Sequence, residues 1–138
     1  MQALWHAHRL VFRATGRGLE RAEAEKLGTL ALRTVGRNSG LCRETLVWYV
    51  VDGLDLVVVA SNAGSDRDPA WWLNLEANPE AEVRTADEWL PYRARRASGE
   101  ELDRLWLRIT ALKPQYAEYR RAAGREIPVV ILEPAAQR

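Results

Sequence analysis

The feature that most constrains the fold is a pair of apolar runs joined by Asp52-Gly53. The runs, at about 45–51 and 54–60, are rich in β-branched residues, which is typical of strands. Asp-Gly is favoured where a tight hairpin turn needs positive φ. In an antiparallel pair the start of the first strand lies beside the end of the second. The polar, glycine-containing loops that flank the pair are therefore predicted to meet at one rim.

Both flanking loops carry cationic side chains, and each offers polar groups to this rim. The residues concerned are Arg37, Asn38, Ser39 and Arg43 in the first loop, and Ser61, Asn62, Gly64 and Arg67 in the second. Basic side chains and exposed backbone N–H groups together can cradle an anion. The residues alone leave two interpretations open: an anion-binding rim, or two charged and solvated hairpin ends.

The rest of the chain predicts further short strands and helices. Strands are expected at 28–35, 80–86, 89–96 and 127–133, and helices from Asp68-Pro69 to Asn78-Pro79, after the capping box at 98–101, and at 115–123. We expect the hairpin strands to be buried on both faces, and Pro91 to place its strand at an edge or a bulge. About six strands without regular βαβ alternation favour an α+β fold with a small antiparallel barrel.

Residues 1–27 are predicted to form an N-terminal helix and a charged connector, ahead of a barrel domain at 28–138. Residues 2–15 combine arginines with Trp5 and Phe12, so they fit either a helix that covers the barrel or one that lies on an anionic membrane. His6 and His8, two positions apart, point to different sides of a helix, and no further His completes a metal site.

Composition excludes several classes of function. The 138 residues suit one domain. A net charge of +1, with no recognised nucleic-acid motif, argues against a nucleic-acid partner. Cys42 is the single cysteine, so there is no intramolecular disulfide and a reducing compartment fits. Without a long apolar run or a signal-peptide pattern, the chain is expected in the cytoplasm.

An ordered series of motifs resembles the deazaflavin-dependent nitroreductase family, small actinobacterial reductases that use coenzyme F420. The series covers about residues 28–134 and reads V-G-R-N-S-G-L-C-R, T-L-V-W-Y-V-V-D-G, S-N-A-G-S-D-R-D-P-A-W-W-L-N-L, A-N-P-E and R-E-I-P-V-V-I-L-E-P. The resemblance implies a split β-barrel related to FMN-binding, pyridoxamine-phosphate-oxidase-type proteins. It also implies hydride transfer from reduced F420 to an electron-poor quinone, activated alkene or nitroaromatic.

The resemblance gives the candidate residues roles. Residues expected to bind the cofactor are Arg37, Asn38, Ser39, Arg43, Ser61, Asn62, Gly64, Arg67, Pro69 and Trp71. Trp48, Tyr116 and Tyr119 are expected around the acceptor, and Ser61 or Tyr119 is the candidate proton donor. Arginines and N–H groups suit the polyanionic tail of F420, while aromatic walls suit its flat ring.

This chain departs from the family pattern at several positions. Asn38 replaces a usual Lys, Glu44 a frequent basic residue, Ala63 a Gly, Leu46 a Pro and Lys113 a Tyr. A lost cation and an added carboxylate are expected to weaken binding of an acidic tail by about 1–3 kcal/mol where the groups are desolvated. Two alternatives therefore stand: a split barrel that binds FMN, and a non-catalytic cofactor-binding or membrane-associated relative. Either a monomer or a homodimer is compatible with the sequence.

Overall fold

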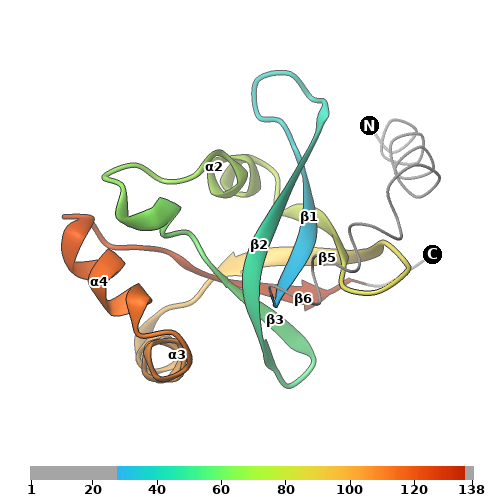
Figure 1. The fold of residues 1–138 in the computed structure, drawn as a ribbon. Coiled ribbons are helices and arrows are strands. Elements are labelled where there is room, and N and C mark those ends of the chain that lie inside the picture. The colour runs from blue at the N-terminus through green and yellow to red at the C-terminus, as the bar shows by residue number, and fades with distance from the viewer. Residues whose placement is uncertain (1–27, 136–138) are drawn as a thin grey trace.

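The computed structural model describes residues 28–135, so the predicted N-terminal helix and connector at 1–27 lie outside the described residues. Within 28–135 the strands form a closed antiparallel barrel in the order β1-β2-β3-β6-β5-β4 (Figure 1). The strands are β1 (Thr29–Val35), β2 (Cys42–Asp52), β3 (Asp55–Val59), β4 (Glu80–Arg84), β5 (Leu90–Arg96) and β6 (Val129–Pro134). The predicted fold class is confirmed.

Short helices lie between these strands and cover parts of the barrel (Figure 1). They are the 3-10 turn η1 (Asn62–Gly64) and the helices α2 (Ala70–Ala77), α3 (Gly99–Leu112) and α4 (Gln115–Ala122). In Figure 1, α3 and α4 lie on one side of the barrel, with η1 beside α4, while α2 lies near the β1–β2 loop. None of the helices in the described part of the chain is long and apolar enough to span a membrane.

The predicted hairpin forms as expected, with Asp52 opposite Asp55 and Gly53 at φ +63°. Its two strands differ in burial. The strand β3 is buried on both faces: Leu56 and Val58 point into one core cluster, whereas Val57 and Val59 pack in the cluster formed with α3 and α4. In contrast, the residues of β2 are half-buried or exposed apart from Val50, which is buried. The prediction of two buried faces is therefore right for 56–60, and wrong for 45–51 and for Leu54, which is 86% exposed.

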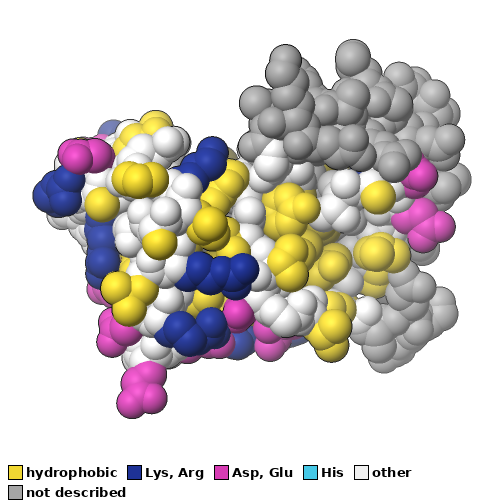
Figure 2. Space-filling view, turned by 60° about the horizontal axis from the view of Figure 1, so that its bottom comes forward, with side chains coloured by type: hydrophobic (Ala, Val, Ile, Leu, Met, Phe, Trp, Pro, Cys, Tyr) yellow, Lys and Arg dark blue, Asp and Glu magenta, His cyan; other side chains and the backbone are white. Residues whose placement is uncertain are grey.

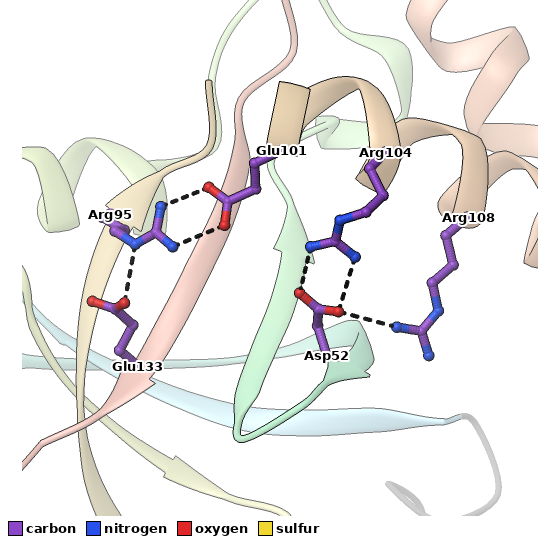
Figure 3. Close-up of polar contacts among 6 residues, drawn as sticks. All are labelled: Asp52, Arg95, Glu101, Arg104, Arg108 and Glu133. Carbon is purple, nitrogen blue, oxygen red and sulfur yellow. Dashed lines mark hydrogen bonds and ion pairs between the residues drawn. The ribbon is translucent and has the colours of Figure 1, made fainter. Parts of the chain in front are cut away.

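Helix α3 is attached to the barrel by an apolar stripe and by ion pairs. Leu105, Trp106 and Ile109 are buried, whereas Leu112 at the end of the helix is 56% exposed. Beyond the stripe, Figure 3 shows two groups of ion pairs. Arg95 on β5 binds Glu101 at 2.8 and 2.9 Å and Glu133 at 3.1 Å. Arg104 grips both oxygens of Asp52 at 3.1 and 2.9 Å, and Arg108 approaches the same carboxylate to 3.6 Å.

Three local predictions are wrong. Pro69 rather than Asp68 occupies the N-cap position of α2, and Ser98, at the N-cap of α3, makes no capping side-chain hydrogen bond. The carboxylate of Asp68 instead binds Arg125. Pro91 does not mark an edge, because β5 pairs with β4 on one side and with β6 on the other.

The turn η1 approaches α4 closely at Gly64. Its φ is +82°, and a Cβ built there would lie 3.3 Å from both Cα and Cδ1 of Tyr119. Glycine at this position therefore answers two requirements, a left-handed backbone and a short separation between η1 and α4.

Gly64→Ala is expected to lower the free energy of unfolding by about 2–4 kcal/mol, through left-handed strain and overpacking against α4. Gly53→Ala is the matched control. Its φ is also positive, but nothing lies within 4 Å of the added methyl group, so about 1–2 kcal/mol is expected. Urea denaturation of both variants measures the difference. Equal losses would show that the contact with α4 does not constrain Gly64.

Candidate active site

A cavity of about 740 Å³ opens where the 36–41 loop and the 60–68 loop meet. The sequence-predicted residues that line it are Arg37, Asn38, Ser39, Arg43, Trp48, Ser61, Asn62, Arg67, Pro69, Trp71 and Tyr116. Two predicted residues lie outside the lining: Gly64, which faces α4, and Tyr119, which packs edge-on against Tyr116 with ring centroids 5.4 Å apart. The hairpin thus brings both loops to one rim, as antiparallel geometry requires.

The buried amide of Asn74 fixes the first loop. Asn74 on α2 is 3% exposed. Its Oδ1 accepts hydrogen bonds from the backbone N–H of Arg37 at 3.1 Å and from Arg37 Nη1 at 2.9 Å, while its Nδ2 donates to Thr34 Oγ1 at 3.1 Å. Since one side chain holds both the backbone and the guanidinium of Arg37, this cation is positioned before any ligand arrives.

The second loop adopts a backbone conformation that suits anions. Ser61 is right-handed at φ −76° and ψ −29°, and the next two residues are left-handed, Asn62 at φ +48° and Ala63 at φ +56°. Successive right- and left-handed residues turn their N–H groups toward one concave point, a nest that binds anions. The N–H groups of these three residues donate to no other group in 28–135, and all three residues line the cavity.

The guanidinium of Arg125 lies at the centre of the second loop. Its Nε donates to the carbonyl oxygen of Ser65 at 3.0 Å, and its Nη1 to Asp68 Oδ1 at 2.6 Å. Its Nη2 lies within 3.2 Å of the carbonyl oxygens of Ala60 and Ser61, and 2.9 Å from that of Arg67. Four backbone carbonyls and a carboxylate are thereby tied to one side chain.

Among the arginines at the rim, Arg67 has the guanidinium with the fewest contacts within 28–135. Its backbone N–H bonds to Ser65 Oγ and its carbonyl accepts from Asn62 Nδ2 as well as from Arg125. Its guanidinium is exposed and has no hydrogen-bond or ion-pair partner within 28–135. The loop therefore fixes the backbone of Arg67 and leaves its charged group available to an anion in the cavity.

Two stacked aromatic rings, here called the aromatic wall, also line the cavity. The rings of Trp48 and Tyr116 stack with centroids 5.1 Å apart, and Lys113 Nζ lies 5.4 Å from the centroid of the Trp48 ring. Burial raises the pKa of Tyr116 above its ordinary value, so its phenol stays protonated at neutral pH. Trp72, by contrast, is 5% exposed and belongs to the core.

Two departures from the family pattern, Glu44 and Ala63, have surroundings that the sequence alone does not reveal. Glu44 lines the cavity, but its Oε1 accepts a 3.0 Å hydrogen bond from Arg33 Nε. Because Arg33 offsets the charge of Glu44, this carboxylate repels an anion less than its position in the sequence suggests. Ala63 occupies a left-handed position, which explains why glycine is usual there.

Cys42 differs from a reactive thiol. Its place beside Arg43 suggests a lowered pKa, but desolvation by burial outweighs the nearby cations and raises the pKa to about 11. At neutral pH the group is a thiol and not a thiolate.

On the face in Figure 2, basic and acidic side chains are intermixed, with hydrophobic side chains between them. Within 28–135 no group of three His, Cys, Asp or Glu side chains is arranged to hold a metal ion. The cations of the rim therefore define the anion site more clearly than any charge pattern seen on that face.

Asn74 and Arg125 were not among the candidate residues predicted from the sequence. Both stand within the family-like motifs W-W-L-N-L and R-E-I-P-V-V, which was the one signal available. Their partners lie far away in the chain: Asn74 bonds to residues 37 and 40 positions away, and Arg125 to residues 57 to 65 positions away. Sequence spacing carries no information about such contacts.

Fold and site together define a split-barrel protein whose cavity is lined by a cationic rim and an aromatic wall. The sequence pattern of the F420H(2)-dependent quinone reductase family matches residues 7–134, and the chain belongs to that family. The predicted relationship is thereby confirmed, together with F420-dependent reduction as the enzyme class and F420 as the family's cofactor.

Individual relatives agree with this membership. An F420H(2)-dependent quinone reductase of Mycobacterium tuberculosis is 30% identical over 132 residues, covering 94% of this chain and 89% of that protein. A solved F420-H2 dependent reductase, FDR-A, is 34% identical, with a TM-score of 0.70 over 77% of this chain and 94% of that one. Another solved relative, 30% identical with a TM-score of 0.70 over 82% of this chain and 96% of that one, is described as a domain-swapped dimer.

A more distant neighbour shows the fold alone. A Listeria innocua protein, provisionally described as a pyridoxamine 5′-phosphate oxidase, is 17% identical with a TM-score of 0.55 over 83% of this chain and 90% of that one. It supports the predicted split-barrel architecture.

The residues present fit a cofactor with an acidic tail and a flat ring. The cavity is lined by a nest with unpaired N–H groups, by Arg67 with its available guanidinium, and by the stacked rings of Trp48 and Tyr116. Charge-assisted hydrogen bonds suit phosphate and carboxylate oxygens, and stacked aromatic rings suit a planar heterocycle.

Ala63→Gly is expected to raise the free energy of unfolding by about 0.5–1 kcal/mol, because glycine adopts the left-handed region without steric cost. Ala117→Gly, on the helix α4, is the control and is expected to lower it by about 1 kcal/mol. Chemical denaturation gives both signs. A loss of stability in Ala63→Gly would show that Ala63 is not strained.

Proposed function

We propose that this protein transfers a hydride from F420H2 to a quinone, with the acidic tail of the cofactor at the rim and its ring beside the aromatic wall. The observation that carries the proposal is the convergence on one cavity of a backbone nest, three arginines and a stacked Trp–Tyr pair. Bound F420H2 supplies the hydride; the residues of this chain bind, orient and shield the reactants.

Tail binding is assigned to both loops of the rim. Arg37 is held by Asn74, Arg43 Nη2 lies 3.3 Å from Ser39 Oγ, and the nest offers three N–H donors. Arg67 adds a guanidinium free to form paired hydrogen bonds with a phosphate or a carboxylate. Asn38 lies in the same lining and supplies a neutral amide in place of a cation.

The acceptor is assigned to the aromatic side of the cavity. A quinone is flat and apolar, so Trp48 and Tyr116 suit its rings. Its reduction to a hydroquinone needs one hydride and one proton. We assign to the phenol of Tyr116, which lines the cavity and whose pKa is raised by burial, donation of a hydrogen bond to a quinone oxygen as negative charge develops there. Of the proton donors expected from the sequence, Ser61 also lines the cavity, whereas Tyr119 lies outside the lining and packs edge-on against Tyr116.

Arg67→Gln is expected to raise the dissociation constant of F420 about tenfold, since it removes a charge-assisted hydrogen bond. Titration of purified protein, followed by the cofactor's fluorescence, measures this. The control is Arg93→Gln, which removes an equal charge from β5 outside the cavity lining and is expected to change affinity less than about twofold. Similar affinities for both variants would contradict tail binding at this rim.

Tyr116→Phe is expected to lower kcat/KM for a soluble naphthoquinone about tenfold, through loss of one hydrogen bond that strengthens in the transition state. F420 affinity should change less than about twofold, because the ring wall remains. Tyr119→Phe, which keeps the edge-on contact, serves as control and should leave kcat/KM nearly unchanged. If Tyr119→Phe shows the larger loss, the hydrogen-bonding role belongs to Tyr119.

The same experiments separate the alternatives. Binding of F420 without turnover of quinones, enones or nitroaromatics would support a non-catalytic family member. A yellow purified protein that releases FMN on denaturation would support flavin binding instead. Peripheral membrane contact through residues 2–15 remains a separate proposal, tested by sedimentation with anionic vesicles. Size-exclusion chromatography with light scattering distinguishes a monomer from a homodimer, which the domain-swapped relative makes a specific question.

A further inference from the structure

The backbone of the nest is held in place from behind by Arg125. The carbonyl oxygens of Ala60 and Ser61 both accept hydrogen bonds from Arg125 Nη2 at 3.2 Å. The Ala60 carbonyl belongs to the same peptide unit as the N–H of Ser61, and the Ser61 carbonyl to the same unit as the N–H of Asn62. In a planar trans peptide unit, C=O and N–H point in opposite directions. Two carbonyls directed at Arg125 therefore turn two nest N–H groups away from it.

Arg125 itself is absent from the cavity lining, whereas Ser61, Asn62 and Ala63 are part of it. The side chain of Arg125 is 16% exposed, and its Nη1 is paired with Asp68 at 2.6 Å. Its donors are thus occupied by the loop and not by a ligand. A cation bonded to the carbonyl side of a peptide unit also polarises that unit and strengthens its N–H as a donor.

We propose that Arg125 is a positioning residue for recognition of the acidic tail: it orients the nest of Ser61, Asn62 and Ala63 without touching the cofactor. This inference rests on the proposed function and extends it, because it separates recognition of the tail from recognition of the ring. The aromatic wall of Trp48 and Tyr116 lies on β2 and α4 and makes no hydrogen bond with Arg125. Loss of Arg125 therefore weakens binding of the tail selectively.

Lysine cannot replace arginine in this role. Arg125 uses a planar fork to reach four carbonyl oxygens and one carboxylate oxygen at once. A lysine ammonium has three donors on one nitrogen, so it keeps the charge but cannot hold both Ser65 and the Ala60–Ser61 units. Arg125→Lys thus distinguishes orientation of the loop from mere positive charge near the site.

The test compares two ligands, F420 and the same deazaflavin chromophore with its ribityl chain but without the phosphate and glutamate tail. For Arg125→Gln the dissociation constant of F420 is expected to rise about tenfold or more, since a preorganised charge-assisted donor pair is lost. The tail-less ligand should bind with a dissociation constant changed less than about twofold. In steady-state assays KM for F420H2 should rise while kcat stays within about twofold.

The control is Arg121→Gln, which removes an equal charge from α4, where Arg121 pairs among residues 28–135 with the exposed Glu118. Its affinities for both ligands should match those of the unaltered protein. Arg125→Lys should recover less than half of the lost binding free energy. Thermal unfolding by circular dichroism identifies folded variants, and Arg125→Lys carries the comparison where Arg125→Gln does not fold.

The outcomes distinguish a failure of the positioning role of Arg125 from a failure of the proposed function. If the unaltered protein binds F420 but the folded Arg125 variants lose affinity equally for both ligands, or for neither, the positioning role is wrong and the proposed function stands. If lysine restores F420 affinity fully, charge and not orientation is what Arg125 supplies, and the inference is again overturned. If the unaltered protein binds no F420 at micromolar concentrations, the proposed function itself fails.

Discussion

The site depends on one constraint: loops that leave a sheet must find partners for their backbone polar groups outside it. At the rim of this barrel two side chains satisfy that requirement. Asn74 receives the N–H of Arg37 on the first loop, and Arg125 binds four carbonyls of the second. The polarity differs between them, because the first partner accepts and the second donates. With its carbonyls bound, the second loop has N–H groups left for the cavity, a donor arrangement that suits an anion.

The fold was largely predictable because its signals are local. Alternating apolar runs and Asp52-Gly53 specify strands and a turn within a few residues. Errors arose where tertiary contacts override local preference. Asp68 is a good N-cap in isolation, but pairing with Arg125 removes it from that role. Pro91 suits an edge, yet barrel closure leaves β5 paired on both sides. Similarly, the β2 strand lines an open cavity, so its apolar run is only half-buried.

The candidate site was predictable in outline, through hairpin geometry and the family resemblance, but not in its supporting contacts. The resemblance pointed to Arg37, Ser61 and Arg67, and the structure brings them to one cavity. It gave no role to Asn74 or Arg125, because residues that act through the backbone of others have no chemical signature of their own. Charge alone was also a poor guide: Arg33 offsets the charge of Glu44, and desolvation by burial outweighs the lowering of the Cys42 pKa by the nearby arginines.

The cavity offers hydrogen-bond donors of two kinds, backbone N–H groups in the nest and the side chains of the rim arginines. Asn38 removes a cation, and Ala63 accepts left-handed strain, yet neither substitution removes an N–H group from the nest. Backbone donors do not depend on residue identity in the way a lysine or arginine does, provided the loop keeps its shape. The loop's shape in turn depends on Arg125, which lies in the last motif of the chain and outside the cavity. A rim built in this way tolerates exchanges among its lining residues and is sensitive to a residue behind them.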